Sequence, residues 1–93
     1  MHLDPGRYRF EGEVRVHGVG SADDWAGARL RVSGARPLQR LSGDAGWSPM
    51  SLEFEVQQER EVEFVCELRA LDGEAWFDPQ TLRLVRVETE VRP

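Results

Sequence analysis

The residue types that carry catalysis are scarce in this sequence. Its only histidines are His2, near the amino terminus, and His17, in a glycine-rich turn. Nucleophilic catalysis needs a nucleophile with a base at hydrogen-bond distance, and Cys66, on the expected inward face of a strand, has no evident partner. The sequence also contains no Gly-rich phosphate loop and no zinc-ligand spacing. We therefore predict that the chain is not an enzyme and uses no cofactor.

Glutamates are plentiful, and their spacing is regular. Glu53, Glu55, Glu63 and Glu67 recur with the two-residue period of a strand. One interpretation is a solvated outer face on which glutamates and arginines form cross-strand pairs, each contributing about 0.2–1 kcal/mol. The alternative is a paired general acid and base. We favour the solvated face, because the period is that of a strand.

The three tryptophans are the strongest candidates for ligand binding. A sugar binds through the flat C–H face of its ring, stacked on an indole, together with polar groups that reach its hydroxyls. A tryptophan that binds sugar must therefore be exposed. Trp47 follows a turn and leads into a strand, so we expect it to pack in the core or at its rim. Trp25 lies in the loop 23–27, where it either forms a ligand platform or plugs the core.

Trp76 alternates with Phe77 along an expected strand. If Phe77 points inward, Trp76 points outward, onto the face that we expect to carry Arg9, Arg69 and Glu67. Together with the loop tryptophan, these residues form the predicted ligand-binding set. The alternative is that Trp76 covers the sheet or contacts an amino-terminal segment.

Alternation with a period of two dominates the sequence and predicts the strands that position these side chains. A helix would scatter the apolar residues around its axis, whereas a strand places them on one face. Charged residues, mainly arginine and glutamate, take the other face. The expected inward sets are Tyr8, Phe10, Gly12, Val14 and Val16; Ala28, Leu30 and Val32; Met50, Leu52, Phe54 and Val56; and Val62, Phe64, Cys66, Leu68 and Ala70.

Turn signals separate these runs. Asp72-Gly73 between two strand patterns favours a hairpin, because the tight turn needs positive φ. Pro79 ends the strand that contains Trp76, since proline has no amide donor. The last run, 82–87, changes phase midway, which indicates a bulge or burial on both faces. Regularly spaced short strands with turns between them are typical of a sandwich or barrel, whose core would also include Phe77 and Leu84.

The composition fits one soluble domain spanning residues 1–93. Hydrophobic residues make up 40% of the sequence and charged residues 31%, which argues against disorder. The net charge of −5, without a basic patch, disfavours nucleic-acid binding. No segment approaches the roughly 20 apolar residues of a membrane span, and the start of the chain has no apolar run, so we predict neither a membrane span nor a signal peptide.

The single cysteine, Cys66, allows no intrachain disulfide. Its apolar neighbours predict a buried, inert thiol. One cysteine does not fix the compartment, so an extracellular or periplasmic parent protein stays open.

The order of the motifs resembles a known family. The strand at 5–12 has a G-x-Y-x-F-x-G pattern, Gly46-Trp47 precedes the strand 52–56, and Ala75-Trp76-Phe77-Asp78 with Leu82-Arg83-Leu84 closes the pattern. This order is similar to the later strands of galactose-binding-like jelly rolls, in particular the carbohydrate-binding modules of families four and nine. The resemblance covers most of the chain. It implies an antiparallel β-sandwich of jelly-roll type with six to eight strands, and a non-catalytic module that binds carbohydrate.

The resemblance also raises the possibility of a bound calcium ion. In many such modules an aspartate near the final strand helps to hold a structural calcium, together with ligands from amino-terminal strands. Here that aspartate would be Asp78. Calcium needs six to eight oxygen ligands, and the amino-terminal partner segment is lacking, so we favour the alternative that Asp78 caps a turn.

The sequence departs from these jelly rolls at its start, where further strands usually precede the strand at 5–12. The chain is therefore either a reduced sandwich or a piece of a larger protein, excised or engineered. Either would leave a sheet edge open, and open edges invite pairing with another chain. A second hypothesis follows: a structural or protein-interaction module that self-associates through this edge.

Overall fold

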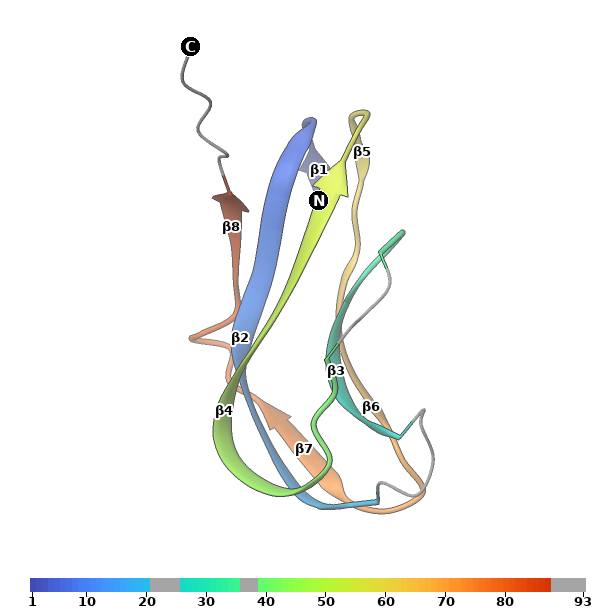
Figure 1. Cartoon of the computed structure of the whole chain (residues 1–93), viewed down its shortest axis with the longest axis vertical. Helices are drawn as coiled ribbons and strands as arrows, with labels where there is room; N and C mark the ends of the chain where they lie inside the picture. The colour runs from blue at the N-terminus through green and yellow to red at the C-terminus, as the bar shows by residue number, and fades with distance from the viewer. Residues whose placement is uncertain (21–25, 36–38, 88–93) are drawn as a thin grey trace.

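The computed structural model describes residues 1–20, 26–35 and 39–87, whose regular elements are all strands (Figure 1). Every pairing among these strands is antiparallel. The prediction of an all-β antiparallel fold with six to eight strands is therefore confirmed. The strands are β1 (His2–Leu3), β2 (Gly6–Val19), β3 (Gly27–Val32), β4 (Gly43–Val56), β5 (Arg60–Glu61), β6 (Phe64–Arg69), β7 (Glu74–Phe77) and β8 (Arg83–Val87).

The long strand β2 lies at the centre of a four-stranded sheet. β4 pairs with it along one side, and β8 and β7 share the other side, opposite residues 7–11 and 14–17 respectively. β2 can pair with three strands because its 14 residues leave room for β8 and β7 to follow each other along one edge. Among the described strands, β8 pairs with β2 alone, so it lies at a margin of this sheet.

A two-stranded sheet of β3 and β6 forms the opposite layer, seen beside β2 and β4 in Figure 1. Phe10 of β2 and Phe64 of β6 join the layers, with ring centroids 5.0 Å apart. The inward side chains of both sheets make one apolar core. Its buried members are Leu3, Tyr8, Phe10, Val14, Val16, Val19, Ala28, Leu30, Val32, Met50, Leu52, Phe54, Val56 and Val62.

The short strands β1 and β5 add a small ladder at one end of the fold. His2 lies opposite Glu61, and Leu3 lies opposite Arg60. His2 also contacts Glu59, and this hydrogen bond is the main reason that the pKa of the imidazole is raised. No sequence pattern indicates this ladder, because a two-residue strand has no periodicity to detect.

The inward sets expected for β2, β3 and β4 are confirmed, but the set expected around β6 is partly wrong. Val62 is buried and Phe64 is half-buried against the core, whereas Cys66 and Leu68 are exposed. In the described chain β6 pairs only with β3, so its inward face reaches the margin of the layer. Cys66 is thus not a buried thiol, although partial burial still raises its pKa.

The turn at Gly73 forms, but the predicted hairpin does not. β6 pairs with β3 and β7 pairs with β2, so this turn carries the chain from one sheet to the other. Gly73 has φ +108°, and a Cβ there would lie 2.6 Å from the carbonyl oxygen of Gly18. Glycine is therefore required both for the backbone conformation and for the close approach of two backbones.

The phase change in the last run reflects burial on both faces of β8. Its pairing with β2 has no register shift. Leu84 is half-buried on the core side, and Val85 and Val87 are half-buried on the opposite side. Of the two alternatives that the sequence left open, the bulge is excluded for this ladder.

Candidate functional site

The polar side chains of β2 gather on one surface of the four-stranded sheet. Residues directly opposite each other in antiparallel strands share a face, so the register identifies the surface. Arg9 lies opposite Glu53 of β4, and Glu11 lies between Ser51 of β4 and Arg83 of β8. We call this surface the outer face. It comprises Arg7, Arg9, Glu11, Glu13 and Arg15 of β2; Pro49, Ser51, Glu53 and Glu55 of β4; Trp76 of β7; and Arg83, Val85 and Val87 of β8.

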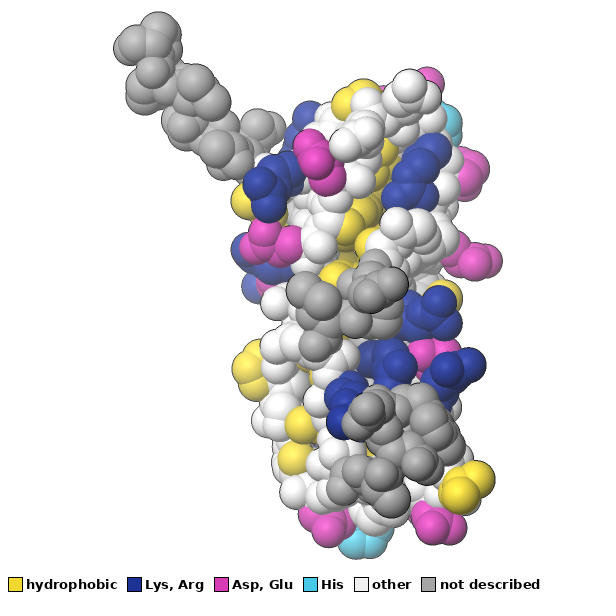
Figure 2. All heavy atoms as spheres, turned by 45° about the vertical axis from the view of Figure 1, so that its right-hand side comes forward, with side chains coloured by type: hydrophobic (Ala, Val, Ile, Leu, Met, Phe, Trp, Pro, Cys, Tyr) yellow, Lys and Arg dark blue, Asp and Glu magenta, His cyan; other side chains and the backbone are white. Residues whose placement is uncertain are grey.

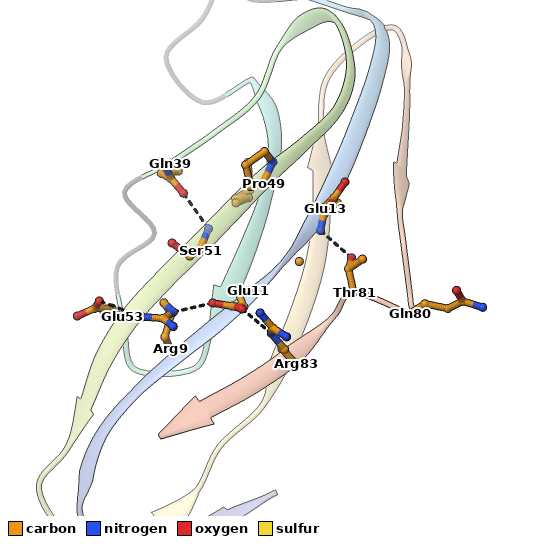
Figure 3. A pocket seen from close by; sticks show the side chains of 12 residues that line it. Arg9, Glu11, Glu13, Gln39, Pro49, Ser51, Glu53, Gln80, Thr81 and Arg83 are labelled. Carbon is orange, nitrogen blue, oxygen red and sulfur yellow. Dashed lines mark hydrogen bonds and ion pairs between the residues drawn. The ribbon is translucent and has the colours of Figure 1, made fainter. Parts of the chain in front are cut away.

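An open cavity of about 790 Å³ lies on the outer face. Figure 3 shows polar side chains from β2, β4 and the turn before β8 arranged around it. Two arginines and three glutamates leave the lining with a net charge of −1, and two glutamines add neutral donors and acceptors. Such a lining suits a neutral ligand rich in hydroxyls. The lining residues are Arg9, Glu11, Gly12, Glu13, Gln39, Pro49, Met50, Ser51, Glu53, Gln80, Thr81 and Arg83.

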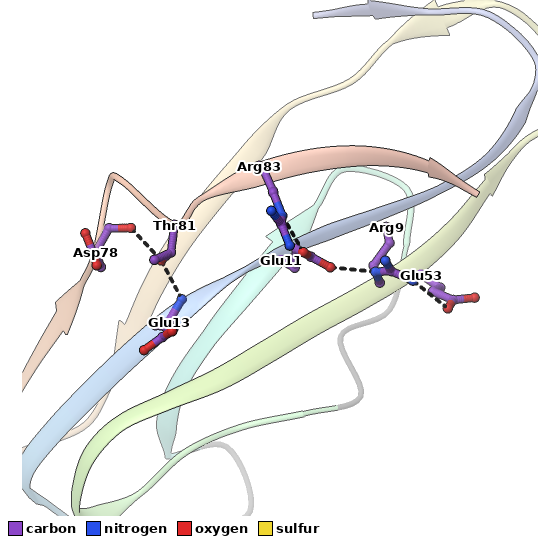
Figure 4. A network of polar contacts seen from close by, with 7 residues as sticks. All are labelled: Arg9, Glu11, Glu13, Glu53, Asp78, Thr81 and Arg83. Atoms are coloured by element: carbon purple, nitrogen blue, oxygen red, sulfur yellow. Dashed lines mark hydrogen bonds and ion pairs between the residues drawn. The ribbon is translucent and has the colours of Figure 1, made fainter.

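Glu11 is the best-held charged group of the cavity. It accepts a hydrogen bond of 2.6 Å from Nε of Arg9 and another from Nε of Arg83 (Figure 4). These two guanidinium groups lower the pKa of the Glu11 carboxyl. Arg9 also approaches Glu53, 3.9 Å away, and Glu53 approaches Arg7, 3.7 Å away. The Glu11 side chain is only 18% exposed. The expected glutamate–arginine pairs are therefore present along this face.

Asp78 belongs to the turn at the other end of the same network. Its carboxylate accepts the backbone N–H of Gln80, and its backbone oxygen accepts the hydroxyl of Thr81. The Thr81 hydroxyl oxygen in turn accepts the N–H of Glu13 (Figure 4). The turn-capping interpretation of Asp78 is thus confirmed. Within the described ranges, no three His, Cys, Asp or Glu side chains are grouped so that they could hold a metal ion.

Two tryptophans flank one arginine beside the cavity. Arg15 lies opposite Trp76, and its guanidinium stands over the indole, 4.9 Å from the ring centroid. On the β4 side, the register slips between the pairs Val14–Ser48 and Val16–Ala45. This bulge puts Gly46 and Trp47 together opposite Arg15, and residues that share such a position point to the same face. Trp47, Arg15 and Trp76 therefore form a row across the outer face, which we call the tryptophan row.

Both tryptophans of this row are substantially exposed. Trp47 is 48% exposed and Trp76 is 39% exposed. Trp76 points outward while Phe77 packs against the core, as the alternation predicted. The expected core packing of Trp47 is wrong, because Trp47 has the outward phase of β4: Met50 is buried and Ser48 lies opposite the buried Val14. The row adjoins the cavity, because Glu13 and Pro49 line the cavity and lie next to Arg15 and Trp47 on the same face of β2 and β4.

The structure does not bring the whole predicted ligand-binding set together. Trp76 and Arg9 share the outer face, but Arg69 and Glu67 lie in the other sheet, so the expectation of one common face is wrong. Trp25 lies outside the described residues. Sequence reasoning missed Arg15 and the exposure of Trp47. For Trp47 a signal was available in the alternation itself, because the inward phase of Met50 and Leu52, continued back along the strand, places Trp47 outward.

Arg69 and Glu67 belong to a second charged surface, on the side of the β3–β6 sheet away from the core. Glu67 lies opposite Arg29 and is approached by Arg29, Arg31 and Arg69 at 3.9, 3.1 and 3.7 Å. Figure 2 shows arginine side chains gathered there around a carboxylate. We call this group the arginine cluster.

Comparison with known proteins gives no assignment. Nowhere in the described ranges is there a helix long and apolar enough to cross a membrane. No family model, no curated protein and no solved structure matches the chain.

Proposed function

We propose that this domain is a non-catalytic carbohydrate-binding module whose ligand lies on the outer face of the four-stranded sheet. The observation that carries the proposal is the tryptophan row beside a polar cavity. An exposed indole offers a flat apolar surface to the C–H face of a sugar ring, and the neighbouring polar groups can bind the hydroxyls. The motif order that resembles galactose-binding-like jelly rolls supports the same function.

The arrangement favours a chain of sugars over a single ring. Trp47 and Trp76 belong to strands on either side of β2, so their backbones stand two strand spacings apart, about 10 Å. Arg15 lies between them with its guanidinium against Trp76. An oligosaccharide that crosses β2 can contact both indoles and receive hydrogen bonds from Arg15.

The charge state of the cavity supports binding without catalysis. Arg9 and Arg83 hold Glu11 in its ionised form and lower its pKa. A general acid for glycoside hydrolysis needs a raised pKa instead. Glu11 therefore serves as a hydrogen-bond acceptor and as the anchor of two arginines.

The test is a titration of intrinsic tryptophan fluorescence with a panel of neutral oligosaccharides. We expect a saturable shift with at least one sugar, and a loss of affinity of about fivefold or more in both Trp47→Ala and Trp76→Ala, because each variant removes one stacking surface. Leu71→Ala is the matched control, since Leu71 is an exposed apolar residue away from the row. Its affinity should equal that of the wild type.

Two results would count against the proposal. A shift that survives in both row variants but disappears in Trp25→Ala would move the platform to the loop 23–27. A flat response to every sugar, with sedimentation showing self-association, would favour the interaction module that the sequence suggested as the alternative.

A further inference from the structure

The strand β6 forms one margin of the two-stranded layer (Figure 1). Among the residues that the structure describes, it pairs with β3 alone, so its other edge carries no partner strand. The register with β3 continues to Ser33, whose N–H donates to the carbonyl oxygen of Glu63, 2.9 Å away. Because backbone hydrogen bonds alternate in direction along an antiparallel ladder, the odd-numbered residues of β6 bond to β3. The backbone N–H and C=O groups that point to the open edge belong to Phe64, Cys66 and Leu68.

The side chains on the core side of β6 are less covered than those of β3. Ala28 of β3 is buried, whereas Leu68 directly opposite is 38% exposed. Leu30 is also buried, whereas Cys66 opposite it is exposed. Residues opposite each other share a face, so the exposure comes from the position of β6 at the margin. A strand beside β6 would cover these apolar side chains and bond the backbone groups of the open edge.

The segment 63–69 is complementary to itself in one antiparallel register. This register places Cys66 opposite Cys66 of a second copy. Phe64 then lies opposite Leu68 on the core side, so apolar side chains meet there. On the other side of the sheet, Glu63 of each copy lies opposite Arg69 of the other. The two edges therefore match in apolar character on one face and in charge on the other.

Other registers bring acids together or shorten the ladder. A shift by one residue would set the core side of one strand against the outward side of the other. A shift by two residues places Glu67 opposite either Glu67 or Glu63 of the second copy, and like charges directly opposite each other destabilise a sheet. A shift by four residues reduces the overlap of the two β6 strands from five residues, 64–68, to three at most. In the register centred on Cys66, Glu67 lies opposite the uncharged Val65.

We infer that two copies of this chain pair through β6, antiparallel, about a two-fold axis at Cys66. The pairing joins the two β3–β6 layers into one four-stranded sheet and closes the open edge of each. The margin at β8 is not self-complementary, since its five residues include two arginines and no acid. The β6 interface is separate from the proposed carbohydrate site, because β6 belongs to the sheet opposite the outer face.

The first test is sedimentation velocity under reducing conditions, from about 10 µM to about 1 mM protein, a range that detects a weak dimer. We expect the wild type to shift from monomer to dimer as its concentration rises. Glu63→Arg should weaken the dimer about tenfold, because both ion pairs between the copies become like-charge contacts. Arg69→Glu should weaken it similarly. The double variant Glu63→Arg/Arg69→Glu restores both ion pairs with reversed sign and should regain the affinity to within about threefold.

The direction of these effects separates a specific contact from a general effect of net charge. The chain carries −5, so a general effect would tighten the dimer in Glu63→Arg and weaken it in Arg69→Glu. Glu55→Arg is the matched control, because Glu55 is an exposed residue of β4 in the other sheet. It should leave the affinity within about twofold of the wild type. Amide spectra establish that each variant is folded before affinities are compared.

Oxidation tests the register. Opposite residues of a hydrogen-bonded pair have Cα atoms about 5.5 Å apart, within the range that a disulfide bridges. Oxidised glutathione, reduced to two thiols, takes up the two electrons and two protons that the Cys66 thiols of the two copies release, so the wild type should form a covalent dimer. Leu68→Cys in a Cys66→Ser background is the control, because its thiols would lie four residues apart along the strands, about 14 Å. It should cross-link about tenfold more slowly or less.

Three results would overturn this interface. The first is a wild type that stays monomeric up to about 1 mM. The second is a dimer whose affinity is unchanged in Glu63→Arg, which would place the contact on another edge, such as that of β8. The third is a Leu68→Cys variant that cross-links as fast as the wild type, which would mean that the pairing is not centred on Cys66.

Discussion

The outer face and the arginine cluster are each organised around one glutamate that arginines contact, but they differ in how acids and arginines are matched. Each has one glutamate whose side chain is 18% exposed and which is held by arginines of its own or a neighbouring strand. On the outer face Glu11 has two arginines, and Arg9 finds a second acid in Glu53. In the cluster, three arginines approach the one carboxylate of Glu67.

The width of the sheet explains this difference. β2 has strands on both sides, so charged residues such as Arg7, Arg9 and Glu11 have a cross-strand neighbour on each side. In the described chain β3 and β6 are each other's main partners, so an arginine of β3 has its cross-strand neighbours on β6. Alternating arginine and glutamate therefore give a network with two acids in the wide sheet, and in the narrow one a cluster gathered on the single carboxylate of Glu67.

The largest expected effect comes from the connection between the two sheets. Gly73→Ala should destabilise the domain by about 3 kcal/mol, because an alanine there combines a strained φ with a clash against the backbone at Gly18. The measurement is urea unfolding followed by circular dichroism. Gly20→Ala is the control, since a Cβ there meets nothing within 4 Å. If the two variants were equally stable, the turn would not fix how the sheets are joined.

A smaller effect should distinguish the two anchoring glutamates. Glu67→Gln removes the carboxylate that three arginines approach and should cost about 1–3 kcal/mol of unfolding free energy. Glu11→Gln should cost about 1 kcal/mol or less, because Arg9 keeps Glu53 and the exposed Arg83 can be solvated. Urea unfolding of both variants at neutral pH makes the comparison. Equal losses of unfolding free energy in the two variants would show that the contribution of each glutamate to stability does not depend on how many acids its arginines contact.

Much of the fold was predictable from alternation, because period-two patterning reports directly which face of a strand is buried. This argument found the buried faces of β2, β3 and β4 and the outward direction of Trp76. It failed where burial depends on neighbours in space. Cys66 and Leu68 have the inward phase, yet they lie at the margin of a two-stranded layer and stay exposed.

The candidate site was predictable only in part. Trp76 and Arg9 were found from alternation alone. Arg69 and Glu67 would share the face of Trp76 only if β6 and β7 formed a hairpin, whereas β6 pairs with β3 and β7 pairs with β2. Turn chemistry specifies that the chain reverses, but the partner of each strand is decided by packing of the whole core. The direction of Trp47 follows from the same alternation once β4 is known to begin at Gly43, well before its first buried residue, Met50.

The smallest expected effect is a pH dependence that belongs to the outer face. The pKa of Glu11 in the folded state is below its ordinary value of 4.5, through its hydrogen bonds with Arg9 and then Arg83. A carboxyl with a lowered pKa stabilises the fold fully above its unfolded-state pKa and loses that contribution as the pH falls through the folded-state value. The stability difference between wild type and Glu11→Gln should therefore be constant above pH 4.5 and shrink below it.

Urea unfolding of the two proteins from about pH 6 to about pH 3 measures this difference. Subtracting the variant removes the contribution of every other carboxyl that titrates in the same range, so the remaining slope belongs to Glu11. Salt should reduce it, because Arg83 is largely exposed and its pairing is screened. A difference that stayed constant to pH 3 would mean that the two arginines do not hold the Glu11 carboxylate in solution. The outer face would then lack the network with two acids that distinguishes it from the arginine cluster.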